Sequence, residues 1–129
     1  MKKLLIIPLL LACFIGIGQT PDSASIIGKS IRIGNLLVAQ NDFPNLMKWN
    51  ETKVACNFLG NGWRLPTKDE LYKLYQNKDT IGGFKNQFYW SSTAYLNYFF
   101  FAWFQDFNDG NQFNVDDYYT CYVRAVRDL

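Results

Sequence analysis

The run YLNYFFFAWFQDF occupies residues 95–107, and the turn sequence NDG follows it at residues 108–110. Alternate side chains of a strand point to opposite faces, so this many rings cannot all be buried on one face of one strand. The Asn-Asp-Gly turn suits a hairpin that returns through Gln112 and Phe113. The stretch therefore predicts β-structure in which several rings are exposed or lie in a loop.

The composition around this run points to binding. Fifteen aromatic residues lie between Phe88 and Tyr122, and residues 91–120 contain no Lys, Arg or Glu. Soluble domains rarely expose so much apolar surface unless something binds to it. Tyr, Asn, Asp and Ser among the rings are also typical of antibody binding loops. An unusually aromatic core is the alternative interpretation, and composition alone does not choose between the two.

Upstream of this run the pattern changes from strand-like to helical. Asn50 can cap a helix that ends before Gly60, and Thr67 with Glu70 has the spacing of a capping box for a second helix. Residues 30–39 read as a hairpin and residues 122–127 as a closing strand. These helices and strands predict an α+β domain. The expected buried stripes are Val54, Ala55, Phe58 and Leu59 on the first helix, and Leu71, Leu74 and Tyr75 on the second.

The amino terminus is typical of export. Residues 1–18 read as a secretory signal peptide, residues 19–27 as a flexible leader and residues 28–129 as one domain. Cleavage would give a secreted, periplasmic or cell-surface protein. The alternative is a lipobox ending at Cys13, which would anchor the chain to a membrane through a lipid. No internal repeat or second domain is expected.

Several chemistries are disfavoured by what the sequence lacks. The chain has no histidine, the commonest general base and metal ligand, and no nucleophile motif, so we expect no enzyme and no cofactor. Without residues 1–18 the charges balance, and no basic stripe for nucleic acid remains. Cys56 and Cys121 would be the only cysteines of an exported chain, which suggests a disulfide, although spacing alone cannot show that they meet.

Strings that recur in one order identify a family resemblance. Among them are GWRLPT at residues 62–67, YWSST at 89–93 and YVRAVR at 122–127. Together they resemble the C-terminal domain of the Legionella collagen-like adhesin and its bacterial relatives, over roughly residues 28–129. That resemblance implies a C-type-lectin-like fold: two helices followed by a twisted antiparallel sheet with long loops. It is closest to the variable proteins of diversity-generating retroelements, in which adenines of a 3′ segment are rewritten.

The resemblance implies a fixed framework and a variable binding region at about residues 95–121. Every candidate variable position holds a residue that an adenine-mutated AAC codon can encode, whereas Trp103, Gln105 and Gln112 cannot be reached that way. Cys121 is also a candidate variable position, so its pairing with Cys56 stays open. The expected structural residues are Trp63, Arg64, Pro66, Trp90, Trp103 and Gly110. The expected ligand-binding residues are Leu96, Asn97, Tyr98, Phe99, Phe100, Phe101, Phe104, Asp106, Asn108, Asp109, Phe113, Asn114, Val115, Asp116, Asp117, Tyr118 and Tyr119.

These residues support one main prediction: an exported protein that binds a protein or glycan partner through rings, Asn and Asp. Trp90, Trp103 and Phe107 are expected to fill the inward face. The alternative is that the core also contains Phe99, Phe101 and Phe104. An undiversified adhesin that binds extracellular matrix or glycosaminoglycans is another, disfavoured by the negative charge of the face. A calcium site at the Asp and Asn residues is disfavoured because their spacing misses the EF-hand loop.

Overall fold

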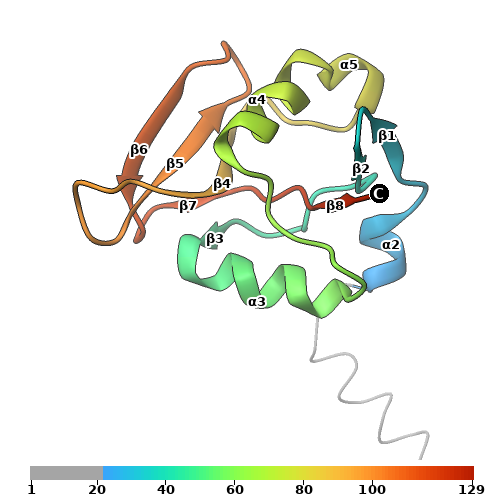
Figure 1. Ribbon diagram of the computed structural model, residues 1–129, viewed down its shortest axis with the longest axis horizontal. Coiled ribbons are helices and arrows are strands. Elements are labelled where there is room, and N and C mark those ends of the chain that lie inside the picture. Colours follow the sequence, from blue (N-terminus) through green and yellow to red (C-terminus); the bar gives the residue numbers. More distant parts are fainter. Residues whose placement is uncertain (1–21) are drawn as a thin grey trace, which may run out of the picture.

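The computed structural model describes residues 22–129 and has an α+β architecture (Figure 1). The predicted signal peptide, the lipobox cysteine Cys13 and the start of the predicted leader lie outside the described residues. The helices are α2 (Ser23–Ile27), α3 (Trp49–Leu59), α4 (Lys68–Gln76) and α5 (Lys78–Ile81). The strands are β1 (Ile31–Ile33), β2 (Leu36–Val38), β3 (Met47–Lys48), β4 (Phe88–Ala94), β5 (Phe101–Asp106), β6 (Gln112–Asp116), β7 (Thr120–Cys121) and β8 (Val126–Asp128).

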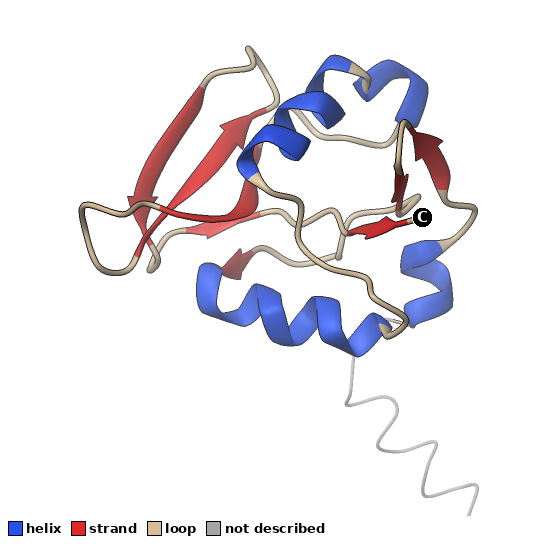
Figure 2. Ribbon diagram, viewed as in Figure 1, coloured by secondary structure: helices blue, strands red, loops and turns tan. Residues whose placement is uncertain are grey.

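The strands form three small antiparallel sheets rather than one (Figure 2). The predicted amino-terminal hairpin is confirmed as β1 and β2, and the carboxy-terminal strand β8 pairs with β2. The short strands β3 and β7 form the second sheet, and β4, β5 and β6 form the third. The amino-terminal hairpin and the last strand of the described chain therefore form one sheet, while the third sheet extends away from it (Figure 1).

Helix α4 forms as its capping signals predict. The Thr67 side chain accepts a hydrogen bond from the Glu70 backbone N–H, and the Glu70 carboxylate accepts one from the Thr67 backbone N–H. Leu71 and Leu74 are buried, as predicted. Arg64 pairs with Glu70 at 2.7 Å and with Asp128 at 2.8 Å, which ties α4 to β8 and supports the structural role expected for Arg64.

Helix α3 begins earlier than predicted and turns a different face to the core. Its amino-terminal cap is Lys48, not Asn50, because Glu51 accepts the Lys48 backbone N–H at 2.8 Å and closes the first turn from there. The buried residues are Thr52, Cys56 and Leu59. Of the predicted stripe, Val54 is 72% exposed and Phe58 is 54% exposed, so that prediction is wrong for both.

Two short helices, α2 and α5, were not predicted from the sequence. Residues 23–27, expected to be flexible, form α2: Asp22 accepts the Ala24 backbone N–H, and Ile26 is buried in the core. The Asn41 side-chain amide donates to the Ser25 carbonyl, and the Asn41 backbone N–H donates to the Ile26 carbonyl. These two hydrogen bonds hold α2 on the domain. Helix α5 extends the α4 segment to Ile81, which is also buried.

A buried ion pair joins distant parts of the chain. Arg124, with a side chain 0% exposed, donates to Asp42 at 2.8 Å and to the backbone carbonyls of Ala39 and Gly82. Its guanidinium also lies 4.0 Å from the centre of the Phe84 ring. Tyr89 donates its hydroxyl hydrogen to Asp42. The closing segment before β8 is therefore fixed from inside.

Candidate functional site

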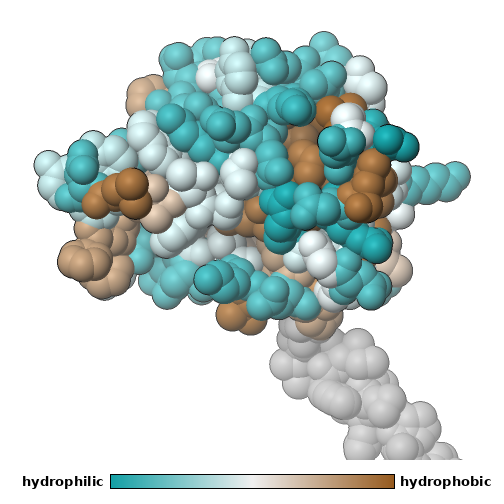
Figure 3. Space-filling model, viewed as in Figure 1, coloured by the Kyte–Doolittle hydropathy of each residue, from teal (hydrophilic) through white to brown (hydrophobic). Residues whose placement is uncertain are grey.

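Exposed rings gather at one end of the third sheet. The β4–β5 loop (residues 95–100) and the β6–β7 turn (residues 117–119) project there, and Figure 3 shows apolar side chains at this end of the molecule. We call the exposed apolar residues of these two segments the aromatic face: Leu96, Tyr98, Phe99, Phe100, Tyr118 and Tyr119. All six were predicted ligand-binding residues. The structure brings them to the surface together, and Asn97 is exposed among them.

Backbone hydrogen bonds fix the two segments that carry the aromatic face. Tyr95 N–H donates to the Phe101 carbonyl at 2.8 Å, which closes the β4–β5 loop. Asp117 N–H donates to the Phe100 carbonyl at 2.7 Å and joins this loop to the β6–β7 turn. Phe100 has a φ angle of 64°, in the left-handed region that ring-bearing residues rarely adopt. Such strain persists only where the surroundings impose it, and it is common at binding sites.

The rings are also ordered by one another. Tyr95 stacks on Tyr98 with centroids 5.7 Å apart, and its other neighbour is Trp103 at 5.6 Å. Tyr98 in turn contacts Phe101, which is half-buried. The Lys68 ammonium lies 3.7 Å from the Trp103 ring centre. The aromatic face is therefore built on half-buried rings and is not a set of independent side chains.

A hollow of about 350 Å³ opens between the aromatic face and the start of α3. At the edge of this hollow, the Lys48 ammonium lies 5.4 Å from the centre of the Tyr118 ring. Sequence reasoning missed Lys48 and Asn50 because they lie far upstream of the predicted binding region at residues 95–121, and only the β3–β7 pairing brings them there. The residues that line this hollow, named below the Lys48–Tyr118 pocket, are Lys48, Asn50, Phe99, Phe100, Asp116, Asp117 and Tyr118.

The structure separates three predicted site residues from the rest. Asp106 ends β5, and Asn108 and Asp109 belong to the β5–β6 turn that follows it. This turn lies at the opposite end of the third sheet from the β4–β5 loop (Figure 1). That turn packs beside α4: a Cβ on Gly110, whose φ is 85°, would lie 2.5 Å from Tyr75. The Asp106 and Asp109 carboxylates accept the backbone N–H groups of Asn108 and Asn111. A single continuous binding face over all predicted residues is therefore wrong.

The expected orientation of Trp103 and Phe104 is reversed. Phe104, predicted at the surface, is 9% exposed and belongs to the core with Trp90, whereas Trp103, predicted inward, is half-buried. Adjacent residues of a strand face opposite sides of the sheet, so a strand that buries Phe104 turns Trp103 to the other face. Between Trp90 and Ala94 the pairing of β4 with β5 shifts its register.

The predicted residues of β6 divide between surface and core. Phe113 is exposed and packs its ring 5.6 Å from that of Phe104, next to the partly exposed Phe88. Val115 packs against the core, so its expected surface position is wrong. Asn114 is half-buried. Only Phe113 of these three presents a large side chain to solvent, on a different part of the sheet from the aromatic face.

The two described cysteines are not bonded. Cys56 on α3 and Cys121 on β7 are free thiols in the same core cluster, so the structure contains no disulfide between them. Burial raises the pKa of each thiol to about 12, because the thiolate would lose its hydration. Both are therefore neutral core side chains at physiological pH.

The titratable side chains of residues 22–129 form no metal centre. Within residues 22–129 no three His, Cys, Asp or Glu side chains gather where they could hold a metal ion. Burial raises the pKa of Asp42 despite the nearby Arg124, and burial with the adjacent Asp42 raises the pKa of Tyr89. These groups bond to each other in the interior, so their shifts reflect packing. No described helix is both long and apolar enough to cross a membrane.

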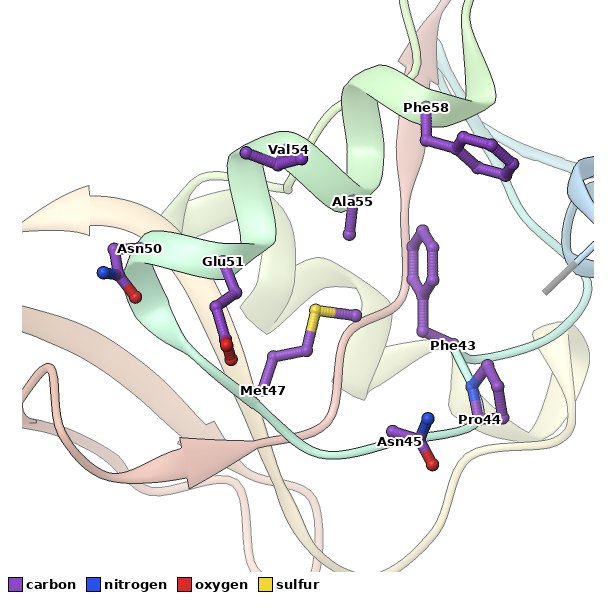
Figure 4. A pocket seen from close by; sticks show the side chains of 9 residues that line it. All are labelled: Phe43, Pro44, Asn45, Met47, Asn50, Glu51, Val54, Ala55 and Phe58. Carbon is purple, nitrogen blue, oxygen red and sulfur yellow. The ribbon is translucent and has the colours of Figure 1, made fainter. Parts of the chain in front are cut away.

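A second hollow, of about 540 Å³, follows the exposed side of α3 (Figure 4). It results from the unexpected exposure of Val54 and Phe58, which with Ala55 form one wall. Phe43, Pro44 and Met47 form the other wall, on the segment that leads into β3. Asn50 lies at one end and also lines the Lys48–Tyr118 pocket. We call this surface the α3 groove.

Comparison with known proteins places the chain in a family. No curated protein matches it. The Lcl C-terminal domain family matches residues 33–127, which span β1 to β8 and contain both the aromatic face and the α3 groove. This family is adhesin-like and non-catalytic, which suggests an extracellular or surface protein. The chain is a member of the Lcl C-terminal domain family.

Proposed function

We propose that this chain is an exported, C-type-lectin-like binding domain whose aromatic face holds a protein or glycan partner without catalysis. The observation that carries the proposal is the exposure of Leu96, Tyr98, Phe99, Phe100, Tyr118 and Tyr119 on adjoining segments. The core has its own rings, among them Tyr89, Trp90 and Phe107 at 0% exposure. The exposed rings are therefore not needed to fill the interior, and binding gives a physical reason for them.

The aromatic face is suited to recognition because its parts are held before a partner arrives. Stacked rings lose little conformational freedom on binding, and large aromatic side chains near the centre of an interface carry most of its energy. Phe100 is already in its left-handed conformation, so the strain of presenting its ring belongs to the free domain. Asn97, Asp116 and Asp117 supply polar groups that select among partners.

The charge of the face distinguishes partner classes. Asp116 and Asp117 are the carboxylates that line the Lys48–Tyr118 pocket, against one lysine. Two carboxylates repel sulfated sugars, so an adhesin that binds glycosaminoglycans through this face is disfavoured. A protein, or a glycan without sulfate, is the better fit.

The binding proposal is tested on arrays of glycans and extracellular proteins probed with purified protein. The variant Tyr98→Ser/Phe99→Ser/Phe100→Ser should lose signals that the native chain gives, because the contact rings are gone. The matched control Val54→Ser/Phe58→Ser removes exposed apolar side chains from the α3 groove instead and should keep them. Signals that persist in the first variant and vanish in the second would contradict the proposal.

We further propose that the aromatic face is diversified by a retroelement. Its support is the family resemblance together with the exclusion of Lys, Glu, Met and Trp from all candidate variable positions. Sequencing the DNA downstream of the gene tests it. A near-copy of the 3′ end that differs at adenines, beside a reverse-transcriptase gene, is the expected result. A gene with neither would favour a fixed adhesin-type domain.

A further inference from the structure

We propose that the Lys48–Tyr118 pocket takes the cationic end of one basic side chain, an arginine or a lysine, from a protein partner. The inference rests on the proposed binding role of the aromatic face and names the chemistry of its ligand. The hollow is about 350 Å³, within the range of small-molecule sites and sufficient for a guanidinium with part of its methylene stem.

The walls of the pocket are suited to a cation. Phe99, Phe100 and Tyr118 line it, and the faces of such rings carry negative electrostatic potential that attracts ammonium and guanidinium groups. The Lys48 ammonium already lies 5.4 Å from the Tyr118 ring centre, so this ring accepts a cation in the free protein. An apolar ligand would use the rings but not the carboxylates beside them.

The carboxylates set the sign of the charge that the pocket accepts. Asp116 and Asp117 are half-buried, and within residues 22–129 neither forms a salt bridge. One Asp116 oxygen accepts the Tyr118 backbone N–H at 2.8 Å, and the other oxygen remains for a ligand. Two carboxylates against the single Lys48 ammonium leave the pocket negative. Partly buried carboxylates gain most from a donor that is itself charged, and arginine can bind them in a bidentate manner.

The rest of the variable region supports this assignment. Residues 91–120 contain no Lys or Arg, so this segment cannot supply a cation of its own to Asp116 or Asp117. Lys48 comes from outside the segment, at the end of β3. Its position at the pocket edge makes it a like charge to the incoming side chain. Removing the Lys48 charge should therefore strengthen cation binding, which a purely structural lysine would not do.

The test uses N-acetyl-arginine amide as the probe and the neutral isostere N-acetyl-citrulline amide as its control. We expect the arginine probe to bind with a dissociation constant on the order of millimolar, as suits one side chain, and the citrulline probe at least about tenfold more weakly. Titration followed by backbone amide NMR shifts should move the signals of Tyr118 and Phe100. Equal binding of both probes, or binding of neither, would overturn the proposal.

Three variants locate the effect. Asp116→Asn/Asp117→Asn should weaken the arginine probe by about tenfold or more, and Lys48→Met should tighten it by a few-fold. Asp79→Asn, on the exposed first turn of α5, should change nothing. An undiminished affinity in the double variant would refute the inference. If partner binding on the arrays still depends on the rings in that case, the proposed function stands while this ligand class falls.

Discussion

The chain uses the same residue types in two opposite ways. Around Phe107, the rings of Tyr75, Phe84 and Tyr89 pack within 4.5 to 5.6 Å of its centre, and Phe107 and Tyr89 are fully buried. On the aromatic face, Tyr98, Phe99 and Phe100 also contact neighbouring rings but remain mostly exposed. Ring-to-ring contact therefore does not define a core. The buried cluster is enclosed by α4, α5 and strands, whereas the aromatic face is covered by nothing in the described structure.

The largest effect is expected on the buried side of this comparison. Arg124→Met removes a guanidinium with a fully buried side chain from Asp42 and from two backbone carbonyls. Breaking a buried ion pair in this way costs about 3–5 kcal/mol, because a polar partner remains in the interior without its bond. Chemical denaturation measures the loss. A variant within about 1 kcal/mol of the native chain would show that this network does not hold the fold.

The corrected position of Phe104 gives the next largest effect. Phe104→Ala opens a cavity beside Trp90 and should lower the free energy of unfolding by about 3 kcal/mol or more. Phe99→Ala, five residues earlier and 89% exposed, should stay within about 0.5 kcal/mol. The pair sharpens the contrast between the two regions within one hairpin. Equal losses would mean that both rings are core.

Helix α4 and strand β5 show how far the sequence predicts the structure. Helix α4 was predictable because its cap, its capping-box partner and its apolar residues lie within nine residues of one another. The orientation of β5 was not, because apolar side chains occur on both of its faces and alternation carries no information. The buried face is set by tertiary packing, which places Phe104 beside Trp90 in the core.

The candidate site was predictable in part for the same physical reason. The exposed rings of residues 96–100 and 118–119 follow from an excess of aromatic residues over what one buried face can hold. Lys48 and Asn50 could not be found this way, since β3 meets β7 only in the folded chain. The turn at Asp106 to Asp109 was grouped with the face by composition, and antiparallel connectivity places it at the other end of the sheet.

A moderate effect is expected where α4 meets β8. Hydrogen bonds from Arg64 lower the pKa of Glu70 below its ordinary value. A depressed carboxylate pKa stabilises the fold above the unfolded pKa, and this contribution is lost as the pH falls through the folded pKa. Glu70→Gln should therefore lower the free energy of unfolding by roughly 0.5–1 kcal/mol at neutral pH, after allowance for solvent screening. The loss should be smaller at acid pH. Denaturation at several pH values measures it, with Asp69→Asn as control.

The smallest effect is expected to be a gain. Phe100 occupies a left-handed conformation that glycine adopts without strain, so Phe100→Gly should raise the free energy of unfolding by up to about 1 kcal/mol. Phe99→Gly, at a similar exposure but without a positive φ, should instead lower it. Thermal unfolding compares the two. If Phe100→Gly is more stable but binds its partner more weakly, the strained conformation of Phe100 serves binding at a cost in stability.

The most direct test of the central claim is the stability of Tyr98→Ser/Phe99→Ser/Phe100→Ser. If these rings are present for binding, the triple variant unfolds cooperatively, with a free energy within about 1 kcal/mol of the native chain, because each side chain is already mostly solvated. Denaturation followed by tryptophan fluorescence reports this through the buried Trp63 and Trp90. Loss of a cooperative transition would mean that the aromatic face is part of the folding core, and would contradict the account.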